Sequence, residues 1–284
     1  MSTTIFELSE VYYRYEDGTE ALKNINLRIE RGKKIALLGS NGAGKSTLLL
    51  HLNGLLKPTS GTICIDGQPL TYSRKELINL RRRVGIVFQN PETQLFNGTV
   101  RDDICYGPYN LKLPEWERKT LIEKAIILTD VGELLDKPIH FLSGGQKKRV
   151  SIAGVLAMDP EVILFDEPTA SLDIYYTKKI RKLLDELHRD GRTLILSTHD
   201  IDFAYEWADE AIVMHQSEVL FQGNFSQLFE EHKDIITKAN LETSIIFEIA
   251  QILKNGGVNL NTIDYRSKEQ LLEILKDYLL KVTI

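Results

Sequence analysis

Apolar and polar residues alternate near the start of the chain, from Ile5 to Ile29, and the alternation breaks at Asp17-Gly18. Such alternation is typical of strands that bury one face, and an Asp-Gly pair is typical of a turn. The segment therefore predicts strands of an antiparallel sheet joined by a turn. A shorter apolar run, Ile63–Ile65, precedes a second turn pair, Asp66-Gly67, and predicts one more strand.

Uninterrupted apolar runs of strand length recur further along the chain and are typical of buried strands. Helical spacing of apolar residues predicts the helices Lys45–Asn53, with Gly54 near its end, and Ile174–His188. Strands that alternate with helices indicate an α/β core. The runs that predict its strands are Lys33–Leu38, Val84–Phe88, Val162–Phe165 and Thr193–Thr198.

Two further regions have the apolar spacing of helices. The first extends from Asn90 to His140 and is clearest in Trp116–Leu128. It lies between core strands, so it predicts an inserted helical subdomain at about residues 90–158. We expect this subdomain to belong to a main domain that covers residues 1–224.

The second helical region begins at Phe225. It predicts the helices Leu241–Leu253 and Lys268–Leu280, which are separated by the breaker Asn255-Gly256-Gly257. We therefore expect residues 225–284 to form a helical C-terminal extension.

Composition excludes some classes of partner. The net charge is −5, and Lys and Arg are scattered among acidic residues, so no basic surface is expected to attract nucleic acid. The cysteines Cys64 and Cys105 are 41 residues apart (105 − 64) and lack CxxC spacing, which favours a reduced, cytosolic setting. The sequence starting at Met1 does not resemble a secretory signal, and no apolar stretch approaches the ~20 residues of a spanning helix. Membrane association is therefore expected only through a partner.

A glycine-rich motif of the form Gly-x4-Gly-Lys-Ser/Thr follows the first predicted core strand and leads into a helix. Backbone amides of such a loop, and the positive end of the helix, bind phosphate oxygens. Lys45 can reach the β- and γ-phosphates, Ser46 is a hard oxygen ligand for Mg²⁺, and Thr47 is expected near the α-phosphate. The motif predicts an ATP site, one side of which the antiparallel sheet would cover. Its residues are Gly39, Ser40, Asn41, Gly42, Ala43, Gly44, Lys45, Ser46 and Thr47.

Two adjacent carboxylates, Asp166 and Glu167, follow the strand Val162–Phe165. Ligands of open α/β sheets bind at the carboxyl ends of the strands. Side chains of neighbouring residues on a strand diverge, so the two groups can have different tasks. We expect Asp166 to orient Mg²⁺ through its water and Glu167 to act as the general base on the attacking water.

Two more predicted strands end in polar side chains that can reach the same edge of the sheet. Gln89 offers an amide to Mg²⁺ or to water, and His199 is expected to contact the γ-phosphate. Each is weak as an isolated signal, because a histidine after a strand is usually structural or solvated. The prediction depends on the sheet placing both beside Glu167.

The full set of motifs resembles that of the ATP-binding cassette (ABC) proteins over roughly residues 5 to 222. The remaining members of the set are Leu142-Ser-Gly-Gly-Gln146, which stands 20 residues before Asp166 (166 − 146), and Ser171-Leu-Asp173. The resemblance implies a P-loop, RecA-like core and a dimer with two ATP molecules between its subunits. It also implies ATP hydrolysis. Rival ABC classes fit less well, because only 98 residues (143 − 45) separate Lys45 from Ser143, too few for the long coiled coil of the DNA-repair proteins.

The resemblance also assigns residues that composition and spacing leave unassigned. In the family the signature faces the ATP of the opposite subunit, and here it would do so through Ser143, Gly144, Gly145 and Gln146 at a helix N-terminus. Asp173 would cross the dimer interface. Tyr15 matches the aromatic residue that stacks on adenine, and Tyr13 is close enough to be an alternative.

A closer resemblance links the chain to the ATPase subunits of energy-coupling-factor importers, particularly those of the cobalt branch. It implies a second ATPase subunit, identical or paralogous, a transmembrane scaffold, a substrate-binding membrane protein and a peripheral position on the cytoplasmic face of the membrane. Glu92 would dock basic residues of the scaffold, or it is a plain solvated glutamate, and the helical tail would help to hold the dimer. Vitamin or nickel import, and another class of ABC importer, stay open as alternatives. The segments that carry this resemblance are Asn90–Phe96, Tyr106–Pro108 and Gln146–Gly154.

Overall fold

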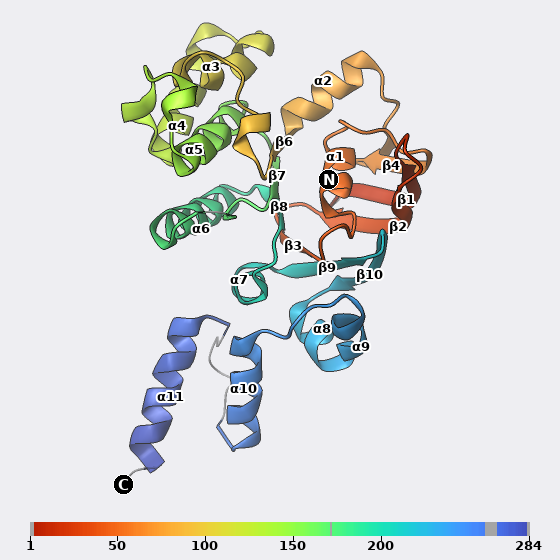
Figure 1. Ribbon diagram of the computed structural model, residues 1–284, viewed down its shortest axis with the longest axis vertical. Coiled ribbons are helices and arrows are strands. Elements are labelled where there is room, and N and C mark those ends of the chain that lie inside the picture. The colour runs from red at the N-terminus through yellow and green to blue at the C-terminus, as the bar shows by residue number, and fades with distance from the viewer. Residues whose placement is uncertain (1–2, 171, 259–265, 283–284) are drawn as a thin grey trace.

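The computed structural model describes residues 3–170, 172–258 and 266–282, and side chains up to residue 276. Its strands form two sheets that lie beside each other (Figure 1). The smaller sheet is antiparallel and four-stranded, in the order β2-β1-β4-β5, which confirms the hairpin predicted at Asp17-Gly18. Its strands are β1 (Thr4–Arg14), β2 (Glu20–Glu30), β4 (Ser60–Ile65) and β5 (Gln68–Pro69).

The larger sheet is six-stranded, in the order β10-β9-β3-β8-β7-β6, and it is parallel except for the edge strand β10. The four predicted core strands are all present, although β6, β8 and β3 are one residue shorter than expected. β9 and β10 are strands that the sequence patterns did not predict. The strands are β3 (Lys34–Leu38), β6 (Val84–Val87), β7 (Val162–Asp166), β8 (Thr193–Ser197), β9 (Glu210–His215) and β10 (Glu218–Gly223).

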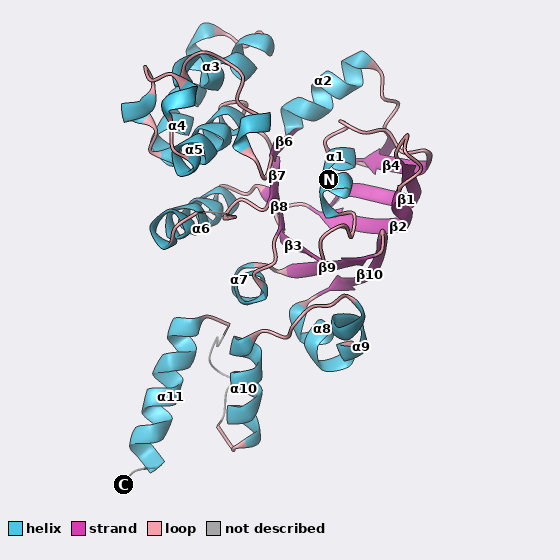
Figure 2. Ribbon diagram, viewed as in Figure 1, coloured by secondary structure: helices cyan, strands magenta, loops and turns pink. Residues whose placement is uncertain are grey.

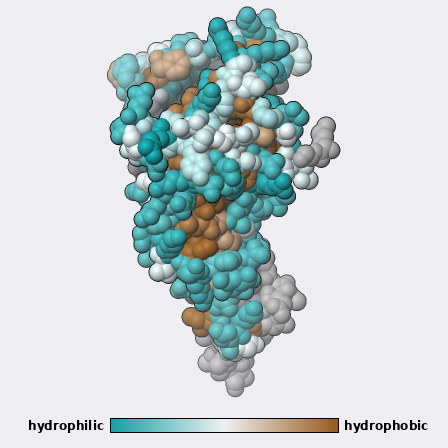
Figure 3. All heavy atoms as spheres, turned by 90° about the vertical axis from the view of Figure 1, so that its right-hand side faces the viewer, coloured by the Kyte–Doolittle hydropathy of each residue, from teal (hydrophilic) through white to brown (hydrophobic). Residues whose placement is uncertain are grey.

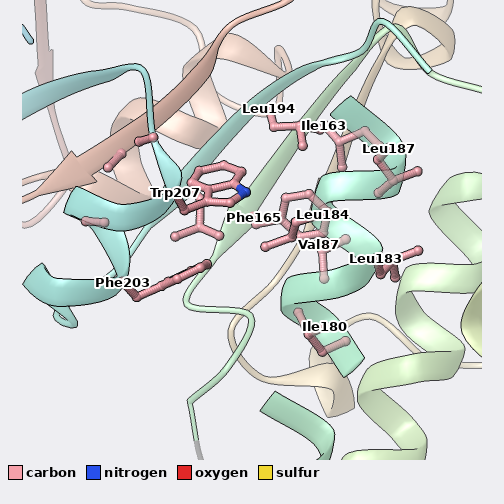
Figure 4. Close-up of a cluster of buried hydrophobic side chains, with 14 of the residues drawn as sticks. Val87, Ile163, Phe165, Ile180, Leu183, Leu184, Leu187, Leu194, Phe203 and Trp207 are labelled. Atoms are coloured by element: carbon pink, nitrogen blue, oxygen red, sulfur yellow. The ribbon is translucent and has the colours of Figure 1, made fainter. Parts of the chain in front are cut away.

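Alternating side chains of the six-stranded sheet enter two different hydrophobic cores. One face packs with the antiparallel sheet and α1 (Lys45–Leu52), and the other packs with α6 (Ile174–Arg189) and α7 (Ile201–Trp207). On this second face, Phe165 of β7 lies among leucines of α6 and the rings of Phe203 and Trp207 (Figure 4). The sheet is therefore held from both sides, and the loops at its carboxyl edge are placed by a rigid support.

Shortening one side chain of this core should lower the stability of the fold by a small but measurable amount. Ile163 is fully buried in β7, and we expect Ile163→Val to lower the free energy of unfolding by about 0.5–1.5 kcal/mol, because a methylene group is lost from a packed site. Denaturant titration would measure the change. The matched control is Ile127→Val, because Ile127 is 77% exposed and the same change there should leave stability unaltered. Equal effects at both positions would contradict the assignment of Ile163 to the core.

Helices α3 to α5 form a separate layer beyond β6, at the upper left of Figure 2. They fall within the range 90–158 in which helices were predicted. The helix α2 (Arg74–Arg83), which lies nearer the antiparallel sheet, was not predicted, because it contains few apolar residues and is rich in charge. The elements of the helical layer are η1 (Pro91–Thr93), α3 (Val100–Asn110), α4 (Glu115–Thr129), η2 (Gly132–Leu134), η3 (Ile139–Phe141) and α5 (Gly144–Leu156).

The C-terminal helices lie at the opposite end of the molecule from α3 (Figure 1). The predicted helix starting at Leu241 in fact begins at Ile245, because Ser244 caps it, with its hydroxyl oxygen accepting from the Phe247 amide. Part of the tail, residues 259–265 and 283–284, lies outside the described residues. The helices are α8 (Phe225–Glu231), α9 (Lys233–Lys238), α10 (Ile245–Asn255) and α11 (Lys268–Val282).

The surface on the side of the antiparallel sheet is largely hydrophilic, with hydrophobic side chains gathered near its middle (Figure 3). Among the described residues, none of the helices combines the length and the apolar character that crossing a bilayer requires.

Candidate nucleotide site

The glycine-rich loop lies between β3 and α1, as its sequence predicts. Its first and last glycines have φ angles of +145° at Gly39 and +101° at Gly44. A Cβ at Gly39 would lie 2.3 Å from the carbonyl oxygen of Met214, and one at Gly44 would lie 2.5 Å from that of Ala21. Both positions therefore require glycine, for backbone conformation and for the close approach of β9 and β2.

Lys45, the first residue of α1, is only 6% exposed. Its ammonium group donates to the carbonyl oxygens of Gly39, at 2.7 Å, and Ser40, at 3.1 Å. Burial lowers the pKa of Lys45, and the nearby carboxylates Glu167 and Asp166 oppose this effect. The side chain thus curls back over the loop, where it can exchange these carbonyls for phosphate oxygens.

A cavity of about 500 Å³ opens beside the loop. It brings together residues that the sequence predicted from distant segments, including Tyr15, Gln89 and Glu167. Residues of the turn before β2 and the start of that strand also contribute, and no pattern in the sequence had marked them. The lining residues are Tyr15, Thr19, Glu20, Ala21, Asn41, Gly42, Ala43, Gly44, Lys45, Ser46, Thr47, Gln89 and Glu167.

The two candidate adenine-stacking tyrosines occupy different places. Tyr15 lines the cavity, and its hydroxyl lies 3.1 Å from the hydroxyl of Thr47. Tyr13 packs its ring against Tyr15 and against His51 of α1, and burial raises its pKa. Tyr15 therefore lies where it could contact a bound base, and Tyr13 packs against the ring of Tyr15.

Asp166 ends β7 and is 8% exposed. Its carboxylate accepts a hydrogen bond of 2.6 Å from the hydroxyl of Ser197, and the same hydroxyl accepts one of 3.0 Å from the Glu167 amide. Ser197 therefore holds both acidic residues in place. It was not predicted as a site residue, although it ends β8 and pairs in register with Asp166.

Glu167 joins the predicted polar residues into one cluster. The Gln89 amide donates to one carboxylate oxygen at 2.8 Å, and Nε2 of His199 contacts the other. Glu167 directly follows β7 and has a φ of +45°, which is uncommon outside glycine. The sheet thus brings Gln89, Glu167 and His199 together, as the sequence predicted.

The signature residues lie at the start of α5, and none of them lines the cavity beside the glycine-rich loop. Ser143 caps the helix, accepting from the Gln146 amide at 3.3 Å, while the Gln146 side chain accepts from the Ser143 amide at 2.9 Å. This capping box fixes a helix N-terminus where Gly144 is exposed and would meet nothing if it carried a Cβ. The exposed amides form an end that attracts anions.

Asp173 also caps a helix, since its carboxylate accepts from the Tyr176 amide at 2.8 Å at the start of α6. Ser171, the first residue of that motif, lies outside the described residues. Glu92 lies on η1 with its side chain 60% exposed, and its carboxylate is 2.5 Å from the ammonium of Lys147.

Lys148 is a residue that sequence reasoning missed. It is 2% exposed, and its ammonium donates to the backbone carbonyls of Phe88 at 2.8 Å and Gln89 at 2.6 Å. Burial lowers the pKa of Lys148 to about 8, against the opposing effect of Asp166 and Glu167. This buried cation therefore connects α5 to the Gln89 cluster.

Comparison with known proteins identifies the architecture. The profile of the ABC transporter family matches residues 22–170. The chain belongs to this family. It is 47% identical over 249 residues to the energy-coupling factor transporter ATP-binding protein EcfA of Methanocaldococcus jannaschii, a match that covers 88% of this chain and 89% of that protein. It is 48% identical to EcfA3 of Clostridium perfringens, over 89% of each chain.

Solved structures of ABC proteins have the same fold. CbiO1 of Clostridium perfringens, described as part of the ABC transporter complex CbiONQ, aligns with a TM-score of 0.73 and 46% identity over 89% of this chain and 100% of that one. A dimeric ATP-binding cassette with bound ADP and phosphate aligns with a TM-score of 0.71 and 32% identity over 78% and 98%. The predicted resemblance and P-loop fold are thus confirmed: this ABC protein is an ATP-hydrolysing subunit of the energy-coupling-factor type.

Proposed function

We propose that the chain is one of two ATPase subunits that drive an importer, most directly one for cobalt ions, from the cytoplasmic face of the membrane. The observation that carries the transport role is an apolar groove between the core and the helical layer. The choice of cobalt is supported by the resemblance of Asn90–Phe96 and Gln146–Gly154 to the cobalt branch and by the likeness to CbiO1. Nickel and vitamin import, and another class of ABC importer, are the alternatives.

ATP would lie in the 500 Å³ cavity, its phosphates on the glycine-rich loop and its base against Tyr15. Lys45 is placed to exchange the carbonyls of Gly39 and Ser40 for β- and γ-phosphate oxygens. Thr47, whose hydroxyl is beside that of Tyr15, would contact the α-phosphate.

The donors around this cavity are suited to Mg²⁺, which prefers oxygen ligands. Ser46 and Gln89 line the cavity, and buried Asp166 precedes Glu167, which also lines it. Asp166 would accept a hydrogen bond from a water on the metal. Bound Mg²⁺ would neutralise charge on the phosphate oxygens. Among the described residues no three His, Cys, Asp or Glu side chains gather as a metal site, and phosphate oxygens and water would supply the remaining ligands.

Hydrolysis would use the Glu167 cluster. Glu167 accepts a proton from water as the water oxygen bonds to the γ-phosphorus, the bond from that phosphorus to the bridging oxygen breaks, and ADP leaves. Gln89 and His199, which contact the carboxylate, orient it and the γ-phosphate.

A second subunit would complete each site. The signature end of α5, with Ser143, Gly144, Gly145 and Gln146, is built to bind an anion, yet it lies away from the chain's own glycine-rich loop. We infer that it binds the γ-phosphate of ATP held by the partner, with Asp173 at the interface. The domain formed by residues 1–224 would make this contact, and the extension, residues 225–284, would help to hold the pair together.

The groove lies where the core meets the helical layer. It has a volume of about 560 Å³, and exposed apolar side chains line it from both sides. Among them are Ile78 of α2, Phe96 of the loop before α3 and Tyr106 of α3, with exposed fractions of 52%, 65% and 50%. An apolar groove of this kind accepts the apolar face of a helix. We assign it to a helix of the transmembrane scaffold. A basic residue of that helix could reach Glu92, whose exposed carboxylate pairs with Lys147.

Phe96→Ala should weaken binding of the scaffold at least about tenfold, because exposed aromatic anchors dominate interface energies. Co-purification from detergent-solubilised membranes and titration with the isolated scaffold would measure it. The control is Trp116→Ala, because Trp116 is 72% exposed but does not line the groove. If both variants bind as tightly as the wild type, the scaffold docks elsewhere.

The proposal is tested by purifying the chain from native membranes and identifying the proteins that accompany it. A single ATPase species together with dedicated metal-transport membrane proteins supports a homodimeric cobalt importer. A second, paralogous ATPase beside a shared scaffold would support vitamin import by a heterodimer. Recovery without any membrane protein would overturn the transport role.

A further inference from the structure

The loop after β6, residues 88–95, is bonded to α5 through backbone carbonyls, while the side chain of Gln89 reaches Glu167 at the end of β7. β6 is the last strand of the six-stranded sheet, so its open edge has no neighbouring strand to fix the chain that follows. The carbonyl groups of Phe88 and Gln89 bind instead to the ammonium of Lys148. The position of the Gln89 backbone therefore depends on a side chain of the helical layer.

Further polar contacts join the same loop to α5. The Gln94 side chain accepts from the Phe88 amide at 3.1 Å and donates to the Ser151 carbonyl at 3.0 Å. Glu92 pairs with Lys147 on the exposed side. Lys148 differs from these contacts because it is buried and charged, so each of its hydrogen bonds is strengthened by charge and poorly replaced by water.

The loop also borders a cavity of about 310 Å³. The cavity is lined by Gln89 and Asn90 of the loop, by Gly144 and Lys148 of α5, and by Ala170 and Leu172. Close packing therefore does not fix the loop on this side, and its backbone is held by the hydrogen bonds from Lys148. A shift of α5 would carry Gln89 with it.

From this arrangement we propose that Lys148 is a positioning residue for hydrolysis: it ties the start of the signature helix to Gln89, and through Gln89 to the carboxylate of Glu167. The inference rests on the roles proposed above for Gln89 and Glu167. Its consequence is that the same helix that offers Gly144 to the partner's ATP also sets the placement of Gln89 on the chain's own general base. One helix thus connects the two nucleotide sites of a dimer.

The test compares two variants. Lys148→Met keeps the apolar part of the side chain and loses both donated hydrogen bonds, whereas Lys148→Arg keeps hydrogen-bond donors on a side chain of similar length. In the purified full chain we expect Lys148→Met to lower kcat about tenfold or more, with the KM for ATP changed less than about threefold. Lys148→Arg should retain most of kcat. Lys182→Met is the matched control, because the Lys182 side chain is 78% exposed on α6, and its kcat should equal that of the wild type.

A double-variant cycle separates positioning from a general structural role. If Lys148 acts through Gln89, adding Lys148→Met to Gln89→Ala should cause little further loss of kcat. Full additivity of the two losses, or a fall in thermal stability without a change in kcat, would overturn the inference. If Lys148→Met does not fold, Lys148→Gln, which keeps an amide donor, replaces it with the same expectation at smaller amplitude.

The single variant Gln89→Ala distinguishes failure of this inference from failure of the proposed function. A normal kcat in Gln89→Ala would show that Gln89 has no part in hydrolysis, and the inference would fall with that assignment. A lowered kcat in Gln89→Ala beside a normal kcat in Lys148→Met would overturn the role of Lys148 alone.

Discussion

Replacing Glu167 by Gln should leave ATP bound and lower the turnover number by about 10²–10⁴-fold. The amide has nearly the shape of the carboxylate, so the contacts with Gln89 and His199 can be rearranged without loss of the fold. It cannot accept a proton from the attacking water, which removes the general base. Steady-state ATPase assays and nucleotide titration on the same preparation would measure both quantities.

The control for this variant is Glu115→Gln, an equivalent change at an exposed position in the first turn of α4. Its turnover should equal that of the wild type. A Glu167→Gln variant that hydrolyses ATP at a near-normal rate would show that another group takes the proton, and the assignment of Glu167 as the base would be wrong.

Replacing Lys45 by Met should weaken ATP binding by about 10²-fold or more, because charge-assisted hydrogen bonds to the phosphates are lost and each contributes about 1.5–3 kcal/mol. The methionine occupies similar space at this buried position, so the melting temperature should change little. Titration with a fluorescent ATP analogue would give the dissociation constant.

Lys119→Met, at an exposed position on α4, is the comparison for the loss of one positive charge. It should bind the nucleotide like the wild type. If Lys45→Met binds ATP with an unchanged dissociation constant, the ammonium of the wild-type Lys45 takes no part in phosphate binding and remains on the carbonyls of Gly39 and Ser40.

The local parts of the site could be predicted because their signals lie in short segments. The apolar run before Gly39 and the helix that starts at Lys45 define strand, loop and helix together. The reason that Gly39 must be glycine could not be predicted in this way. The carbonyl oxygen that a Cβ would meet belongs to Met214, on a strand that the patterns did not predict. Long-range contacts of this kind leave no trace in local periodicity.

Buried charge explains the clearest failure of sequence reasoning. The run Gln146-Lys147-Lys148-Arg149 has the composition of an exposed helix face, yet Lys148 and Arg149 are 2% and 9% exposed. Each donates to backbone carbonyls at the end of another element: Lys148 at the end of β6, and Arg149 at the end of α4, where it donates to Thr129 and Asp130. Acceptors supplied by distant segments can thus bury charges that composition would place in water.

Helix boundaries show the same limit on a smaller scale. The apolar spacing extends back to Leu241, but α10 begins at Ile245 because Ser244 supplies the cap and donates its own hydroxyl to Asp202 of α7 at 2.6 Å. The tertiary contact with α7, which follows His199, selects the start. Periodicity predicts that the helix exists, but its first residue is set by the contact with Asp202, which is distant in the sequence.

Whether ATP hydrolysis by this chain drives import through a membrane partner can be measured in proteoliposomes that contain the complex purified from native membranes. With labelled cobalt on the substrate side and ATP on the side of this subunit, we expect accumulation with the wild-type chain and none with Glu167→Gln. Accumulation that is equal in the two preparations, or equal with and without ATP, would contradict the proposed transport role.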